Sequence, residues 1–364
     1  MSRVIVEESD ALVIDLGKSY SSLSTSGCPK VYGGIRYIGF KRVPKNFEHV
    51  DLNNFCRETS RSLGIDIEES AIFLTAVDLK KYSRGSSSYK GVEAEAFVTY
   101  GVDSPSCFEG AEKWKFGTIN VAVIVDEPLS DVGLLDLFRT VSEVKGMIMS
   151  LGGPMCYSSS SVGTPSDATM VASPFGGERF AGSATDVGIS ASLAVLRALS
   201  EQIRNAPVDE HTAKTLGFKD IDEVVKLAVR AYRKAPIPFL SELDAEEEIK
   251  EEIDSILKDP NLRIIIRSAR LAESFLSFGL LPGIEAEEYS SDSSGIIADE
   301  VMGKAIAEYL NGFKGLLAYY WIDRIKEGDK DLEDLSGLPP MTDDVVGAIV
   351  GGVLSRIYDK YSRK

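Results

Sequence analysis

The hydrophobic pattern changes character once along the chain, near residue 205. Before this point, continuous and alternating apolar runs predict β-strands, and stripes of apolar residues three and four apart predict helices between them. After it, only the helical period recurs. Strands are expected within 3–14 and at 71–77, 94–100, 117–126 and 167–172, helices of this half at 52–63, 131–151 and 182–204, and a loop at 19–27. The pattern predicts two domains: an α/β domain with a mixed sheet and helices, 1–205, and an all-α helical domain, 206–364.

The segment 117–126 is the most apolar of these strands, which predicts a position inside the sheet. Thr118 and Asn120 alternate along it, so both side chains reach one face and can enter one pocket. Glu143 and Lys145 lie two residues apart on the next helix, close to an expected interruption at Gly146. Cross-strand polar pairing and a solvated helix surface explain the same four side chains without any function.

The last helix carries a pair of acids and a pair of glycines. It follows two prolines, and Thr342 is expected to cap its N-terminus. Asp343 and Asp344 then fall in the first turn, where the helix dipole alone is enough to favour them. Gly347 and Gly351 lie four residues apart, on one face. Glycine costs helix stability, so we expect a second helix to cross close to this backbone.

A second acidic pair, Asp299 and Glu300, opens another helix, and Gly303 follows it. Two glycine-bearing helices that pack closely can present both pairs at one pole. Four carboxylates this close repel one another and raise each other's pKa unless a cation lies among them. An all-oxygen set of ligands suits a hard ion such as Mg²⁺, so Asp299, Glu300, Asp343 and Asp344 are the candidate metal ligands.

Three blocks follow one another in this half of the chain. They are Asp299-Glu300-Val301-x-Gly303, Tyr320-Trp321-Ile322-Asp323-Arg324-Ile325-Lys326 and Met341-Thr342-Asp343-Asp344-Val345-Val346-Gly347. In this order they resemble the phosphatidylglycerophosphatase A (YutG-like) superfamily, and above all its soluble branch, which includes the archaeal α-ribazole phosphatases (CobZ type). The resemblance covers 206–364. It implies Mg²⁺-dependent removal of phosphate from α-ribazole 5′-phosphate, or from the corrinoid that carries it.

Within this resemblance, one or two Mg²⁺ ions would offset the charge of the phosphoryl group and lower the pKa of a bound water. Asp323 would be a further ligand or a base, and Lys304 or Lys326 would contact phosphate oxygens. A salt bridge between Asp323 and Lys326, three residues apart, explains both residues equally well. The Gly-Ser-rich N-terminal signature of the membrane branch is absent, which disfavours a lipid substrate.

A different set of motifs runs through the first half. They are Thr99-Tyr100-Gly101-Val102-Asp103, Phe116-Gly117-Thr118-Ile119-Asn120, Ser142-Glu143-Val144-Lys145, Gly163-Thr164-Pro165-Ser166-Asp167 and Ala181-Gly182-Ser183-Ala184-Thr185-Asp186. Their order and spacing resemble the adenosylcobinamide amidohydrolase family (CbiZ type) over 8–205. Two positions depart from the family: Phe116 replaces a proline, and Pro165-Ser166 replaces Gly-Thr. Pro165 restricts the backbone before Asp167.

The resemblance implies hydrolysis of the amide that joins the aminopropanol arm to the corrin ring, with the corrinoid as substrate rather than cofactor. Such a reaction needs a base or nucleophile and donors that face the oxyanion. The candidate residues are Thr118 and Asn120 at the pocket, Glu143 to activate water, Lys145 to stabilise the developing charge, and Asp167 or Asp186 to orient the water or bind substrate.

The formal net charge of −16 argues against nucleic acid and anionic membranes as partners. No apolar run reaches the roughly 20 residues of a spanning helix, and the run 345–354 is therefore expected to be core. The N-terminus lacks the apolar segment of a signal peptide. Four widely separated cysteines without a CxxC pair predict buried free thiols in a reducing cytoplasm. Two histidines make a histidine triad or zinc site improbable.

These observations predict a cytoplasmic, bifunctional enzyme of cobamide salvage and assembly that acts on a corrinoid and on α-ribazole phosphate and uses Mg²⁺ in its second half. Two alternatives stay open. One is a corrinoid-binding or regulatory protein with one catalytically decayed half, which the departures at Phe116 and Pro165 favour. The other is a phosphatase whose first half only recruits substrate. A homo-oligomer is compatible with the sequence.

Overall fold

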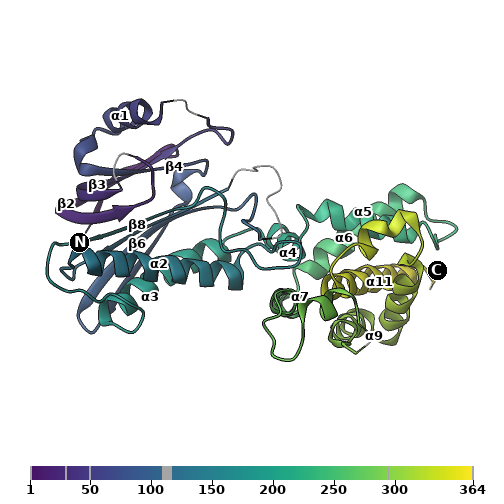
Figure 1. Cartoon of the computed structure of the whole chain (residues 1–364). Coiled ribbons are helices and arrows are strands. Elements are labelled where there is room, and N and C mark those ends of the chain that lie inside the picture. Colours follow the sequence, from purple (N-terminus) through teal and green to yellow (C-terminus); the bar gives the residue numbers. More distant parts are fainter. Residues whose placement is uncertain (1, 29–30, 49–50, 109–116, 294, 363–364) are drawn as a thin grey trace. The chain divides into compact units, whose positions relative to one another are not determined.

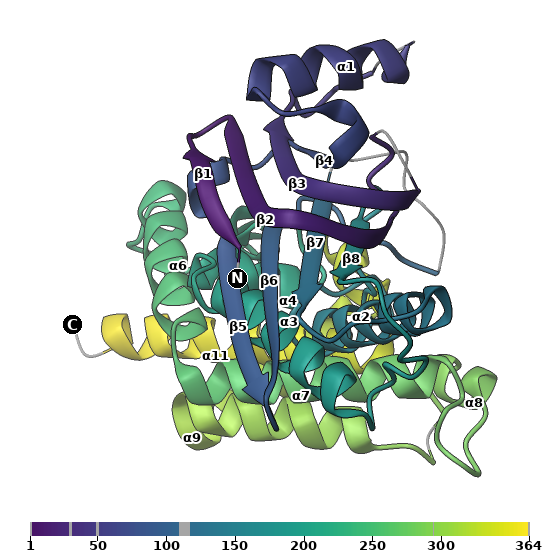
Figure 2. The ribbon, with the colours of Figure 1, turned by 90° about the vertical axis from the view of Figure 1, so that its left-hand side faces the viewer.

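The structure is a computed structural model that describes residues 2–28, 31–48, 51–108, 117–293 and 295–362. The chain forms two compact units (Figures 1 and 2). The first consists of Met1–Ser106, Gly110–Gly153 and Ser161–Asn205, and the second of Cys107–Glu109, Pro154–Ser160 and Ala206–Lys364. The first is α/β and the second is helical, which confirms the predicted fold class. In the described part of the chain, no helix combines the length and apolar content that crossing a membrane requires.

The first unit is built on one mixed sheet with the strand order β4-β3-β2-β8-β7-β6-β5, and β1 pairs with β2 outside this path. The pairs β3–β4 and β7–β8 are parallel, and the other pairs are antiparallel. The strands are β1 Arg3–Glu7, β2 Ala11–Ser24, β3 Tyr32–Arg42, β4 Ser70–Thr75, β5 Ser83–Tyr89, β6 Val92–Gly101, β7 Thr118–Val125 and β8 Ala168–Ser173. Strand β7 lies inside the sheet, as its apolar sequence predicts.

Alternate residues of β7 enter two different cores, which explains its continuous hydrophobicity. Ile119 and Val121 pack in a cluster that includes residues of α2 and α3. Ala122 and Ile124 pack on the opposite face, with the side chains of β2, β3 and β4. The helices of this unit are α1 Leu52–Leu63, α2 Asp131–Gly152 and α3 Asp186–Arg204. Helix α1 ends at Gly64, whose φ of 69° is the left-handed cap that the sequence indicates.

Two expectations for the first unit are wrong, and two of its strands, β3 and β5, were not predicted. The loop expected at 19–27 is largely strand, because β2 continues to Ser24 and pairs there with β8. Helix α2 runs through Gly146 without interruption. Strand β5 was not predicted, because serines occupy much of it. Its Gly85 lies so close to α3 that an added Cβ would be 2.0 Å from the carbonyl oxygen of Ala194.

The cysteines form two disulfides, Cys28–Cys56 and Cys107–Cys156, so the expectation of free thiols is wrong. All four lie in the described residues, and none is free. The cysteines are far apart in the sequence, so the pairing is not visible there. In the fold, the Cα atoms of the two pairs are 5.6 and 5.7 Å apart. The argument from thiols to a reducing compartment therefore loses its basis.

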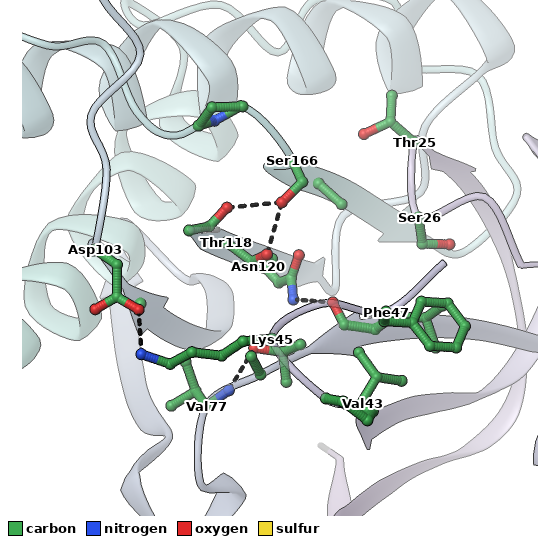
Figure 3. A pocket seen from close by; sticks show the side chains of 18 residues that line it. Thr25, Ser26, Val43, Lys45, Phe47, Val77, Asp103, Thr118, Asn120 and Ser166 are labelled. Atoms are coloured by element: carbon green, nitrogen blue, oxygen red, sulfur yellow. Dashed lines mark hydrogen bonds and ion pairs between the residues drawn. The ribbon is translucent and has the colours of Figure 1, made fainter. Parts of the chain in front are cut away.

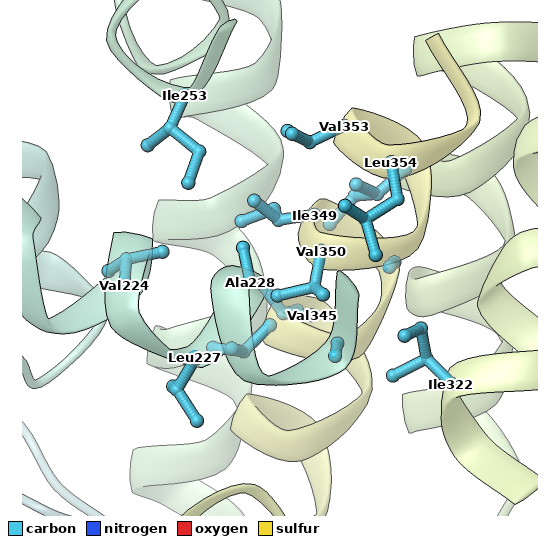
Figure 4. Close-up of a cluster of buried hydrophobic side chains, with 14 of the residues drawn as sticks. Val224, Leu227, Ala228, Ile253, Ile322, Val345, Ile349, Val350, Val353 and Leu354 are labelled. Atoms are coloured by element: carbon cyan, nitrogen blue, oxygen red, sulfur yellow. The ribbon is translucent and has the colours of Figure 1, made fainter. Parts of the chain in front are cut away.

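The second unit surrounds the last helix, α11. Its apolar run from Val345 to Leu354 is buried, as predicted, and Figure 4 shows this run against side chains of the neighbouring helices. The helices are α4 Val208–Thr215, α5 Ile221–Tyr232, α6 Glu242–Leu257, α7 Pro260–Ser277, α8 Ala286–Ser290, α9 Ala298–Lys326, α10 Glu333–Ser336 and α11 Pro340–Ser362.

Helix α9 breaks at Asn311 and Gly312, whose backbone angles are not helical. Its two halves then pack on each other. A Cβ added at Gly315 in the second half would be 2.1 Å from the carbonyl oxygen of Ala307 in the first half, and one added at Gly303 would be 2.8 Å from the Tyr319 hydroxyl. The first residues of the helix and its last residues can therefore lie at the same pole of the unit.

Gly351 confirms the expected close crossing, because a Cβ added there would lie 2.7 Å from the backbone nitrogen of Tyr319 on α9.

Gly351→Ala is expected to lower the free energy of unfolding by about 1–3 kcal/mol through overpacking, measured by denaturant titration. Gly146→Ala is the control, because an added Cβ meets nothing within 4 Å there. It should stabilise α2 by roughly 0.5–1 kcal/mol. Equal effects of the two substitutions would contradict this account.

Candidate functional site

The first unit contains a cavity of about 470 Å³ beside the ends of β4 and β7. Figure 3 shows the side chains that line it. Several of them are polar: Thr25, Lys45, Asp103, Thr118, Asn120 and Ser166. Two of the predicted catalytic residues, Thr118 and Asn120, are in this group, because strand alternation turns both toward the same side of β7.

Thr118 and Ser166 form a hydroxyl pair at the cavity, with 2.8 Å between their oxygens. The Ser166 hydroxyl donates to the backbone carbonyl of Gly117 at 2.6 Å. Since its one proton is used there, the Thr118 hydroxyl is the donor to Ser166. Among the described residues, no donor to the Thr118 oxygen is present, and its own proton can be redirected to a bound group.

Asn120 is almost fully buried, with 1% of its surface exposed. Its side-chain nitrogen donates to the carbonyl oxygen of Leu74 and to Thr99 Oγ1, both at 3.2 Å. A carbonyl can only accept, so the amide group facing Leu74 must be the nitrogen. The opposite atom, Asn120 Oδ1, has no hydrogen-bond partner among the described residues. Leaving a buried acceptor without a partner costs about 1–3 kcal/mol, so this oxygen is a candidate acceptor for a group bound in the cavity.

Lys145 and Asp167 form a mostly buried ion pair at 2.7 Å. Asp167 also accepts hydrogen bonds from the backbone nitrogens of Ile119 at 2.8 Å and Thr164 at 3.1 Å, and from the Thr164 hydroxyl. The pair thus fixes the start of β7, where Thr118 lies, against the loop at 163–167. Neither residue lines the cavity.

Glu143 and Asp186 lie elsewhere in this unit. Glu143 is exposed on α2 and pairs with Arg139 at 2.7 Å. Its neighbour Lys145 is turned inward, because residues two apart on a continuous helix point in different directions. Asp186 lies in the first turn of α3 and pairs with Lys90 at 3.1 Å. The cavity lining includes neither carboxylate, so their assigned roles stay predictions. Phe116, the other departure from the family motif, lies outside the described residues.

Sequence reasoning missed Lys45, which forms an ion pair with Asp103 at the cavity. Asp103 belongs to one of the motifs quoted above, but nothing in the sequence around Lys45 marks it as a site residue. In the sequence, Ser166 stands out only as a departure from the family pattern. Its hydroxyl keeps the chemistry of the threonine that it replaces, and this was the available signal.

In the second unit, three of the four predicted metal ligands meet at one pole. One oxygen each of Asp299, Glu300 and Asp344 lies within 4.8 Å of the other two. Asp299 and Asp344 are buried, with 2% and 7% of their surface exposed. The break in α9 and the close crossing at Gly351 bring them together.

The pKa values of Glu300 and Asp344 are raised, so the charged forms of these carboxyl groups are disfavoured unless a positive charge lies nearby. A hydrogen bond with Asp299, followed by burial, raises the pKa of Glu300 to about 7. Burial raises the pKa of Asp344 to about 7, although the Tyr319 hydroxyl donates to it at 2.6 Å. Acids of this kind release their protons readily when a cation binds. Three carboxylates with only oxygen donors fit a hard divalent ion such as Mg²⁺.

Asp343, the fourth predicted ligand, has a different partner. It binds Lys326, which also pairs with Asp323 at 2.7 Å. Burial raises the pKa of Asp343 to about 6, and the adjacent lysine acts against this shift. Its other oxygen, Oδ1, has no hydrogen-bond partner in the described part of the chain. Lys304, the other predicted phosphate contact, is exposed on α9.

A buried network holds the start of α11 next to these acids. The expectation that Thr342 caps the helix is wrong, because α11 begins at Pro340 and Thr342 lies inside its first turn. The backbone nitrogen of Thr342 donates to Glu273 Oε2 at 3.1 Å. Glu273 is fully buried, as is Arg270, which pairs with it and also binds the hydroxyl of Thr342. Tyr289 donates to Glu273 Oε1 at 2.7 Å.

The cavity has the volume of a small-molecule site, and hydroxyl and carboxamide groups converge on it, so it is the candidate functional site of this α/β unit. A family model described as adenosylcobinamide amidohydrolase matches residues 1–207, more than half of the chain, and the chain belongs to this family. The resemblance stated for the first half of the sequence is thereby confirmed.

Individual relatives match shorter stretches. An adenosylcobinamide amidohydrolase of Methanosarcina mazei is 32% identical over 138 residues, which is 38% of this chain and 62% of that protein. The chain thus spans less than two thirds of this relative. An uncharacterised protein of Methanocaldococcus jannaschii is 26% identical over 114 residues, 31% of this chain and 86% of the relative. The low temperature requirement C protein of Listeria monocytogenes, a crystal structure, is 21% identical with a TM-score of 0.33, covering 39% of this chain and 88% of that one.

Proposed function

We propose that the first unit hydrolyses the aminopropanol amide of adenosylcobinamide and releases adenosylcobyric acid. The observation that carries this proposal is membership of the adenosylcobinamide amidohydrolase family over residues 1–207. The cavity supports it, because the polar groups of Thr118, Asn120 and Ser166 lie together there. In this proposal the amide arm of the substrate enters the cavity, where these polar groups can contact it.

Within this proposal, the Thr118 hydroxyl turns from Ser166 to the oxyanion that forms when water attacks the amide. Asn120 forms the adjoining wall, where its oxygen can accept a substrate N–H or O–H group. Lys145 and Asp167 act as positioning residues, since their ion pair and the bond from Asp167 to the backbone of Ile119 fix this end of β7. Glu143 and Asp186 keep the roles of base and substrate contact only as expectations, to be tested by alanine replacement.

Thr118→Val is expected to lower kcat for adenosylcobinamide by about 100-fold, the usual loss when one oxyanion donor is removed. Valine keeps the shape and the strand preference of threonine, so the fold should persist. The measurement is the rate of aminopropanol release. Ser26→Ala, which removes another hydroxyl from the cavity lining, is the control and should stay within about twofold of the unchanged chain. An unchanged kcat in Thr118→Val would remove Thr118 from the mechanism.

For the second unit, we propose a Mg²⁺-dependent phosphomonoesterase acting on α-ribazole 5′-phosphate. The specific observation in its favour is the group formed by Asp299, Glu300 and Asp344. The ion would be held by these three carboxylates and would supply charge for the phosphoryl group and a more acidic bound water. The exposed Lys304 remains a candidate contact for phosphate oxygens.

One experiment tests both activities. The purified chain is incubated with adenosylcobinamide and, separately, with α-ribazole 5′-phosphate, each with Mg²⁺ or with EDTA. We expect aminopropanol release from the first substrate, and phosphate release from the second only with Mg²⁺. Binding of adenosylcobinamide without turnover would favour a corrinoid-binding protein instead. Phosphate release alone would favour a phosphatase whose first unit recruits substrate, and phosphate release that persists in EDTA would contradict the metal site.

A further inference from the structure

Lys326 is a buried cation at the pole that carries the acidic cluster. Only 9% of its surface is exposed, and its ammonium contacts Asp323 Oδ1 at 2.7 Å and Asp343 Oδ2. Burial alone would lower the pKa of Lys326, but the carboxylates of Asp343 and Asp323 outweigh it and the pKa is raised. The ammonium therefore lies between two carboxylates, which favour its charged form.

The position of this charge follows from the fold. Asp299 and Glu300 open the first half of α9, and Lys326 ends its second half, which the break at Asn311 and Gly312 turns back onto the first. Asp343 and Asp344 are neighbours in α11, yet their partners differ. Asp344 faces Asp299 and Glu300, whereas Asp343 binds the ammonium.

The five carboxylates thus separate into two groups. Asp299, Glu300 and Asp344 lie together and form no ion pair in the described ranges of the chain, although the charge of Lys326 acts to lower the pKa of Asp344. Asp323 and Asp343 hold Lys326 between them. A second divalent ion that used Asp323 and Asp343 would have to occupy the place of the ammonium, because both carboxylates already contact it.

We propose that Lys326 takes the place of a second divalent ion, so that this pole binds one ion per chain. The inference rests on the proposed metal site and sets its stoichiometry. It assigns Asp343 and Asp323 to the lysine rather than to the metal. The pole then presents one divalent ion and one fixed ammonium, a pair of positive charges of the kind that phosphoryl oxygens bind.

The test is to count Mn²⁺ ions bound to the full-length chain by equilibrium dialysis, with electron paramagnetic resonance as an independent readout. We expect one ion per chain. In Lys326→Gln, Asp323 and Asp343 lose their cation, and we expect two. Lys314→Gln is the matched control, because it removes an ammonium from the same helix at an exposed ion pair with Asp359, and it should bind one.

The outcomes are distinguishable. Two ions in the unchanged chain would overturn the inference while leaving the metal site itself in place, and this count needs no variant. One ion in a Lys326→Gln protein with unchanged circular dichroism would overturn it as well. No bound Mn²⁺ in the unchanged chain would overturn the metal site and the inference together.

Discussion

Asp344→Asn is expected to weaken Mn²⁺ binding by at least about 100-fold and to abolish phosphate release from α-ribazole 5′-phosphate. Losses of 10–100-fold are usual when a residue behind a metal ligand is changed, and the loss of a ligand should exceed them. Asparagine keeps an oxygen that can accept the hydroxyl of Tyr319, so the packing of α11 on α9 should survive. The measurements are Mn²⁺ affinity by calorimetry and phosphate release at saturating Mg²⁺.

Asp254→Asn provides the control, since it makes the same change of charge at an exposed ion pair with Lys258 on α6. Its Mn²⁺ affinity should equal that of the unchanged chain. Amide hydrolysis by the first unit should be unaffected in both variants, which separates a local loss from general misfolding. Undiminished Mn²⁺ affinity in Asp344→Asn would remove this residue from the ligand set.

Arg270→Met should lower the free energy of unfolding of the second unit by about 3–5 kcal/mol, the cost of leaving a buried charge without its partner. Glu273 would lose its counter-charge while both side chains stay fully buried. Methionine fills a similar volume, so the loss is electrostatic rather than a cavity effect. The measurement is denaturant unfolding followed by helical circular dichroism.

Lys258→Met is the comparison, because it breaks a solvent-exposed ion pair between Asp254 on α6 and Lys258, which follows this helix. Surface pairs of this type contribute little, and the unfolding midpoint should not change. If Arg270→Met and Lys258→Met behaved alike, the network around Glu273 would not be a major source of stability at the start of α11.

Much of the fold could be predicted from the sequence because burial leaves a periodic pattern. The continuous apolar run of β7, the stripe of α1 with Gly64 behind it, and the buried run of α11 are all present as expected. Prediction failed where the partner, rather than the segment, decides the structure. The serines of β5 form a strand because β6 pairs with them. Gly146 stays helical because the residues on both sides of it belong to the continuous helix α2.

The candidate sites show the same division. Glycines beside acidic pairs predicted that α9 and α11 come close, and Asp299, Glu300 and Asp344 do meet. The sequence could not show that Asp343, one residue away, turns to Lys326. Adjacent residues on a helix point in directions about 100° apart, and only the positions of the neighbouring helices decide what each one meets.

The assignment of 154–160 to the second unit bears on how the two halves can be separated. Arg270 donates to the backbone carbonyls of Cys156 and Tyr157, which precede Ala206 by some fifty residues. A fragment that begins at Ala206, the boundary predicted from the sequence, would lack these two acceptors. The guanidinium of Arg270, which is fully buried, would then lose two hydrogen bonds. The helical unit is therefore completed by a segment that lies, in the sequence, between two parts of the first unit.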